Sequence, residues 1–151
     1  MNARLRLILI IGILLFLSLT TLAAPIPQIP NVPGSLCTQS DPDFETLRYE
    51  AKIPYCKRNV TEERKVKIYE AYGIPKEERS QYTIDHIIPL AIGGSNHDDN
   101  LWPEHHKTIK LCRANLEVIL FKDLRDNKIT QSEAIETVLR VKFHDICYQH
   151  N

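Results

Sequence analysis

The sequence lacks several features that would assign a chain to a functional class at once. Its four cysteines include no C-x-x-C pair, which counts against a structural zinc site. It has 19 Lys and Arg against 19 Asp and Glu, so the basic surplus typical of nucleic-acid-binding proteins is missing. It shows no internal repeat, and its longest apolar run is shorter than the roughly 20 residues of a membrane-spanning helix. The 151 residues suit a single domain.

The N-terminus carries the pattern of a secretory signal peptide. Arg4 and Arg6 precede the apolar run Leu7–Leu19, and small residues follow, with a predicted cut after Ala23. An uncleaved anchor is the alternative. Loss of residues 1–23 leaves 17 basic and 19 acidic residues, which predicts a net charge near −2. We therefore expect a secreted or periplasmic protein with no stable membrane association after cleavage, and no cysteine is placed for lipid attachment.

Two further regions follow the predicted signal peptide. Residues 24–45 are rich in proline and predict an extended arm, and residues 46–151 are expected to form the functional domain. An even number of cysteines in an exported chain favours two disulfides. Three pairings are open, and we favour Cys37 with Cys56 and Cys112 with Cys147.

The hydrophobic pattern of the domain predicts an order of helix, strand, turn-rich loop, short strand, helix and helix. The first helix is expected to be capped by Thr61 and closed by Gly73. Residues 82–86 are expected to form the strand, because β-branched and aromatic side chains dominate there. A helix is predicted from Pro103 to about Leu124, since proline suits a first helical position, and the last helix is predicted to begin near residues 130–132.

Chemically competent residues gather just after the predicted strand. Asp85 and His86 are adjacent, and Pro89 is placed to end regular pairing soon afterwards. Aspartate offers a hard oxygen ligand for Mg²⁺ or Mn²⁺. Histidine takes up a proton near neutral pH, so it suits a general base. Each residue alone would more often be a turn cap or a satisfied buried histidine.

The longer pattern is more specific. The strings "IDHIIPLAIGGSN" and "NLWPEH" place Asn100 fourteen positions after His86. Together they resemble the HNH family of ββα-metal endonucleases, and the ending is similar to a subgroup of small, often exported bacterial members. The resemblance covers roughly residues 54–140. It implies an α+β fold in which two short antiparallel strands and a helix form the ββα-metal motif, surrounded by additional helices.

The resemblance also implies a reaction, the hydrolysis of phosphodiester bonds. His86 would be the general base for an attacking water, and Asn100 would hydrogen-bond across the loop and fix the orientation of His86, or, as in some members, contact the metal. Asp85 would bind a divalent ion, Mg²⁺ first, with Mn²⁺ and Zn²⁺ as alternatives. The substrate would be DNA, with RNA as an alternative. A non-catalytic nucleic-acid-binding or envelope module that keeps the fold is the competing interpretation.

The pattern departs from the family at its final histidine. That ligand usually lies about nine positions after the asparagine, where this chain has Ile109. His105 and His106 are the candidates to replace it, and the "NLWPEH" ending favours His105. Lys107 and Lys110 would lie one helical turn apart and could contact phosphates. No base-reading element is recognisable, so low sequence selectivity is expected.

Overall fold

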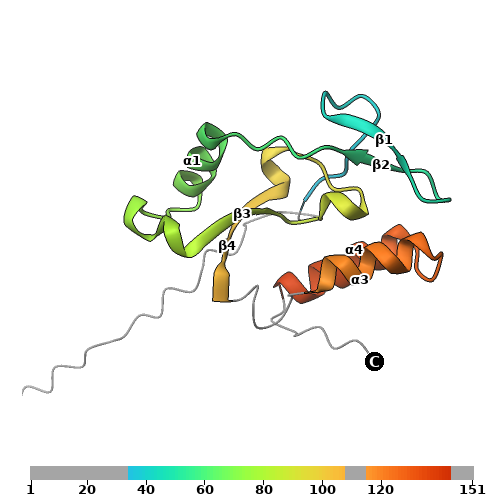
Figure 1. Ribbon diagram of the computed structural model, residues 1–151. Helices are drawn as coiled ribbons and strands as arrows, with labels where there is room; N and C mark the ends of the chain where they lie inside the picture. The colour runs from blue at the N-terminus through green and yellow to red at the C-terminus, as the bar shows by residue number, and fades with distance from the viewer. Residues whose placement is uncertain (1–33, 108–114, 144–151) are drawn as a thin grey trace, which may run out of the picture.

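The computed structural model describes residues 34–107 and 115–143. The predicted signal peptide, residues 24–33 of the predicted arm, Lys110, Cys112 and Cys147 lie outside the described residues. The described part is an α+β structure with two small antiparallel sheets and several helices, so the α+β part of the predicted fold class is confirmed. In Figure 1, the hairpin β3–β4 lies between α1 on one side and the pair α3 and α4 on the other. Within these residues no helix is both long and apolar enough to cross a membrane.

The first sheet was not predicted. It consists of β1 (Phe44–Arg48) and β2 (Ile53–Cys56), which pair antiparallel. The connecting turn places Tyr49 and Lys52 in the left-handed region, at φ 62° and φ 53°. All five residues of β1 are exposed or half-buried, and the sequence FETLR has no apolar pattern that would predict a strand.

Several contacts join the segment that begins at residue 34 to the rest of the domain. Cys37 and Cys56 form a disulfide, which confirms that predicted pair. Leu36 forms an isolated bridge with Gly94, and the amide of Ser95 donates to the carbonyl of Ser35 over 3.0 Å. The end of the segment predicted as an arm is therefore attached to the turn-rich loop.

The first helix, α1 (Glu62–Ala71), agrees with its prediction. The side-chain oxygen of Thr61 accepts from the amide of Arg64 at 3.2 Å, as an N-cap residue does. Gly73 follows the helix with φ +68°, a conformation that glycine adopts without strain. A 3₁₀ helix over Lys76–Gln81 then leads into β3 (Tyr82–His86), where a strand was predicted.

The second sheet corrects one prediction. Strand β4 (Leu101–His105) pairs with β3 along its whole length, from Tyr82 opposite His105 to His86 opposite Leu101. The prediction of a helix starting at Pro103 is wrong, because Pro103 lies inside this strand. A two-stranded sheet has only edge strands, and an edge strand tolerates a proline that has no amide to donate.

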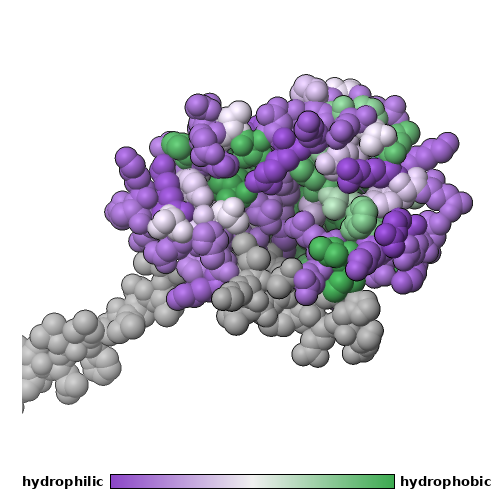
Figure 2. Space-filling model, in the orientation of Figure 1, coloured by the Kyte–Doolittle hydropathy of each residue, from purple (hydrophilic) through white to green (hydrophobic). Residues whose placement is uncertain are grey.

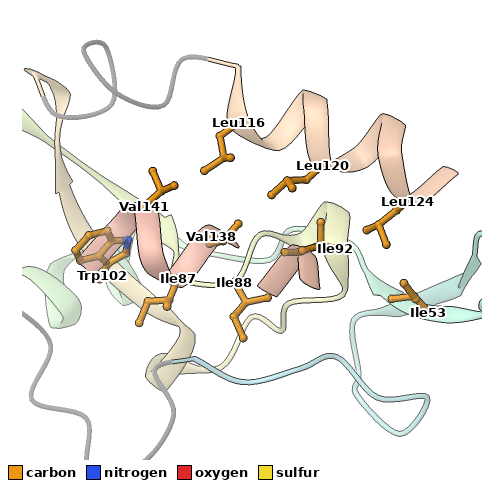
Figure 3. Close-up of a cluster of buried hydrophobic side chains, with 11 residues drawn as sticks. Ile53, Ile87, Ile88, Ile92, Trp102, Leu116, Leu120, Leu124, Val138 and Val141 are labelled. Carbon is orange, nitrogen blue, oxygen red and sulfur yellow. The ribbon is translucent and has the colours of Figure 1, made fainter. Parts of the chain in front are cut away.

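Two helices complete the described core. They are α3 (Leu116–Arg125) and α4 (Gln131–Phe143), and the start of α4 agrees with its prediction. Figure 3 shows the leucines of α3 directed toward the valines of α4 and the isoleucines of the loop after β3. The buried members of this core are Ile53, Ile87, Ile88, Ile92, Trp102, Leu116, Leu120, Leu124, Ala134, Val138 and Val141. Truncation of one such leucine to alanine typically costs about 2–5 kcal/mol, so this packing holds the loop firmly in place.

Candidate active site

His86 ends strand β3 and is almost completely buried, with 2% of its surface exposed. Its Nδ1 lies 3.0 Å from a terminal guanidinium nitrogen of Arg58, and its Nε2 lies 3.1 Å from the Oδ1 of Asn96. A guanidinium only donates, so Nδ1 must accept and the ring proton must sit on Nε2, which donates to Asn96. This arrangement defines a neutral imidazole with its lone pair on Nδ1.

The surroundings also keep His86 uncharged. Burial lowers its pKa from the ordinary 6.5 to about 4, because the charged form loses its hydration. The hydrogen bond to Asn96 and the charge of Asp85 act in the opposite direction, while the charges of Arg58 and Lys142 lower the pKa further. His86 is therefore a neutral proton acceptor at any pH well above 4.

This shift in pKa predicts how folding stability depends on pH. In the unfolded chain His86 takes up a proton below pH 6.5, whereas in the folded chain it does so only near pH 4. The contribution of the buried neutral ring is therefore fully present above 6.5 and is lost as the pH falls toward 4, by about 3 kcal/mol at most. The measurement is urea unfolding of the wild type and of His86→Gln at neutral pH and near pH 4. The wild type should lose more stability than the variant, and equal losses would contradict the assignment.

Asn96 connects His86 to a second polar group. Its Nδ2 donates to the Oδ2 of Asp43 at 3.1 Å and to the carbonyl of Lys57 at 2.8 Å. The Nδ2 of Asn59 donates to the other carboxylate oxygen of Asp43 at 2.7 Å. Both oxygens of Asp43 are therefore engaged by neutral amides, and the network holds the His86 ring from the side of the first sheet.

Asn100 organises the loop rather than touching the His86 ring. It is completely buried, and its Oδ1 accepts from the amide of Ile88 at 2.8 Å. Its Nδ2 donates to the carbonyls of Ile88 and Ser95 at 3.0 and 2.8 Å. A Cβ on Gly94 would collide with the carbonyl oxygen of Ile88, so only glycine allows this close approach. The predicted bond across the loop is present, but the residue in contact with the ring is Asn96.

Asp85 faces a cation supplied by the protein. The Nζ of Lys142, on α4, lies 3.3 Å from the Oδ2 of Asp85 and 2.5 Å from the carbonyl oxygen of His86. The side chain of Lys142 is 2% exposed and that of Asp85 26%. Burial acts to raise the pKa of Asp85, but Lys142 and the backbone amide of His86 outweigh it and leave this pKa below its ordinary value. Asp85 is therefore ionised.

The hairpin register separates Asp85 from His105. His105 pairs with Tyr82, three residues along the strand from Asp85 and thus about 10 Å away. Asp85 also points to the other face of the sheet, because neighbouring side chains on a strand alternate. The ring of His105 packs edge-on against Tyr82, with ring centroids 5.0 Å apart. His106 and Lys107 follow the strand and are exposed. The structure does not bring His105 to Asp85.

The described residues do not complete a metal shell at Asp85. The three side chains that come within ligand distance of one another, among residues 34–107 and 115–143, are Cys37, Asp41 and Cys56. Cys37 and Cys56 are bonded to each other, so neither offers the thiolate that a metal requires. The Cys37–Asp41–Cys56 group therefore offers a ligand set only when the disulfide is reduced.

An open pocket borders this network on the side of the first sheet. Its volume is about 430 Å³. Arg58 lines it, together with Pro42, Asp43, Phe44, Glu45, Lys57 and Asn59. Arg58 was not predicted as a functional residue, since a neighbouring lysine and arginine are most often a solvated basic pair. Asn96 was visible only as the last letter of "GGSN".

Figure 2 shows that hydrophilic residues cover most of the coloured surface on the face in view. Hydrophobic residues form small, separate areas there.

Comparison with family models, with curated proteins and with solved structures finds no match for this chain.

Proposed function

We propose that the chain is an exported, metal-dependent endonuclease of the HNH type that hydrolyses the phosphodiester bonds of DNA with low sequence selectivity, with RNA as an alternative substrate. One observation carries the proposal. His86 is a neutral imidazole at the end of a β-hairpin, and its lone pair on Nδ1 points to an arginine that lines an open pocket. In this proposal β3, β4 and the chain that follows them correspond to the ββα-metal motif.

The proposed chemistry begins at Nδ1 of His86. This nitrogen accepts a proton from water, and the water oxygen attacks phosphorus in line with the leaving oxygen. The bond from phosphorus to the 3′ oxygen breaks, and the leaving oxygen takes a proton from solvent. Asn96 holds the opposite ring nitrogen, so the imidazole stays in the required tautomer. Asn100 keeps the loop that carries Asn96 in place.

A divalent ion is part of the proposal, with Mg²⁺ first and Mn²⁺ or Zn²⁺ as alternatives. Such an ion supplies positive charge at a phosphate. Asp85 is the described residue that would hold it, but its Oδ2 is engaged by Lys142, and Asp85 is not part of the Cys37–Asp41–Cys56 ligand group found among the described residues. Lys107 is exposed beyond β4 and is the proposed additional contact to nucleic acid.

A non-catalytic module is the second candidate, and a specific observation favours it. Two atoms that catalysis would use are both engaged by cationic side chains of the protein: Nδ1 of His86 by Arg58, and Oδ2 of Asp85 by Lys142. A protein that binds nucleic acid without cutting it would keep both contacts in the complex. The two candidates therefore differ in whether these contacts break when substrate binds.

The experiment is a plasmid-nicking assay on the purified protein. Supercoiled DNA is incubated after treatment with EDTA, and then with Mg²⁺, Mn²⁺, Ca²⁺ or Zn²⁺ restored separately. We expect nicking that EDTA abolishes and Mg²⁺ restores, with similar cutting of unrelated DNAs. Binding in a gel-shift assay without cleavage under any of the four ions would replace the endonuclease with the non-catalytic module.

A further inference from the structure

We propose that Arg58 binds the anionic oxygens of the substrate phosphodiester in the pocket beside His86, and that this binding releases Nδ1 of His86 for catalysis. The inference rests on the proposed function, and it adds a substrate-binding residue that the HNH-like sequence pattern does not include. It is carried by the position of the guanidinium, by its charge and by the pocket that it lines.

Two hydrogen bonds fix the guanidinium at the end of β3. One terminal nitrogen lies 3.0 Å from Nδ1 of His86, and the other donates to the carbonyl of Ile84 at 2.8 Å. Arginine has five N–H donors in a planar fork, so three remain for a ligand. The side chain is exposed despite these contacts, which leaves those donors accessible from the pocket.

The partners of Arg58 are both neutral. Within residues 34–107 and 115–143, no carboxylate forms an ion pair with Arg58, whereas Arg64, Arg79 and Arg125 each have one. A guanidinium is always charged and pairs best with a carboxylate or a phosphate through two parallel hydrogen bonds. Arg58 thus provides a positive charge beside the proposed base, with room for an anion.

The two acidic residues that line the pocket, Asp43 and Glu45, differ in how far they offset the positive charge of Arg58. Both oxygens of Asp43 accept hydrogen bonds from the side chains of Asn59 and Asn96, which draws this carboxylate into the wall of the pocket. Glu45 is exposed at the rim, and so is Lys57, which carries the opposite charge. Arg58 is the cation that also touches His86, so an anion bound to it lies next to Nδ1.

The contact with Nδ1 links binding to catalysis. A lone pair that accepts from Arg58 is not available to a water molecule. An anion competes well for the guanidinium, because a charge-assisted bond to phosphate is stronger than one to a neutral ring nitrogen. When the fork turns to the phosphate, Nδ1 is freed at the moment when the scissile group is in place.

Anion binding tests the inference without relying on cleavage. Dimethyl phosphate, which keeps the single charge of a diester, is titrated into the protein by NMR at constant ionic strength, and uncharged trimethyl phosphate serves as the comparison ligand. Arg58→Gln removes the charge, Arg58→Lys keeps it without the fork, and Arg125→Gln is the matched control at an exposed arginine. Thermal unfolding of each variant verifies that it is folded.

We expect dimethyl phosphate, but not trimethyl phosphate, to bind the wild type and Arg125→Gln. Binding should weaken about tenfold or more in Arg58→Gln, and less in Arg58→Lys. Equal binding by folded Arg58→Gln, or no binding by the wild type, would overturn the inference. Failure of the proposed function would look different, because dimethyl phosphate would still bind through Arg58 while plasmid DNA stayed intact with every metal.

Discussion

Replacement of His86 by alanine is expected to lower the rate of DNA cleavage by about 10²- to 10⁴-fold, the usual contribution of a general base. The loss follows from the geometry of the ring. Its Nδ1 is the accepting nitrogen, its Nε2 is held by Asn96, and burial keeps it neutral with a pKa of about 4. The measurement is the initial rate of plasmid nicking at saturating Mg²⁺.

A second histidine provides the matched control for this variant. His97 is exposed in the same loop, and its Nε2 lies 2.6 Å from the Oδ1 of Asp41, outside the network around His86. His97→Ala should therefore keep close to wild-type activity. Circular dichroism of both variants separates loss of chemistry from loss of fold. A folded His86→Ala protein that cuts DNA at the wild-type rate would remove His86 from the role of base.

Replacement of Asn100 by alanine is expected to destabilise the protein by about 3–5 kcal/mol, a large fraction of the stability of a small domain. Asn100 is completely buried and makes three hydrogen bonds to the backbone of Ile88 and Ser95. Alanine would leave these buried backbone groups without their partner, and the penalty for each is about 1–3 kcal/mol. Equilibrium unfolding in urea gives the change directly.

Asn115→Ala is the matched control for Asn100→Ala. Asn115 is exposed before α3, and its side chain makes no capping hydrogen bond. Its replacement should change the free energy of unfolding by no more than about 0.5 kcal/mol, as is usual for such surface sites. If Asn100→Ala is as stable as this control, the asparagine does not hold the loop.

The elements that sequence analysis predicted well are those with strong local signals. Helix α1 has a capping threonine, acidic residues in its first turn and a glycine after its end, and all of these act locally. Strand β3 is rich in β-branched and aromatic residues, and helix α4 has apolar residues at helical spacing. Such signals need no knowledge of the tertiary structure.

The failures have a common physical origin in pairing between distant segments. Residues 101–105 form a strand because β3 supplies partners for all five positions, although Pro103 by itself favours the start of a helix. The misplaced helix also misplaced His105, which lies on β4. Strands β1 and β2 are only five and four residues long, no residue of β1 is buried, and the two strands depend on each other and on the Cys37–Cys56 disulfide.

The residues of the candidate site also fall into two groups, those that local sequence predicted and those that only folding brings to the site. Asp85, His86 and Asn100 were predicted because they belong to one compact pattern in the sequence. Arg58 and Asp43 were missed, because they come from the first sheet and its flanks and reach the site only through folding. Lys142 was missed for the same reason, since it approaches Asp85 from a helix near the end of the described chain.

The hydrogen bonds of the site join residues that are far apart along the chain. Asn96 reaches Asp43 across 53 positions, and Lys142 reaches Asp85 across 57. Contacts of such long range form only at the cost of the entropy of closing the intervening loops. A growing chain on the ribosome that has not yet released α4 therefore lacks the contact of Lys142 with Asp85 and with the carbonyl of His86.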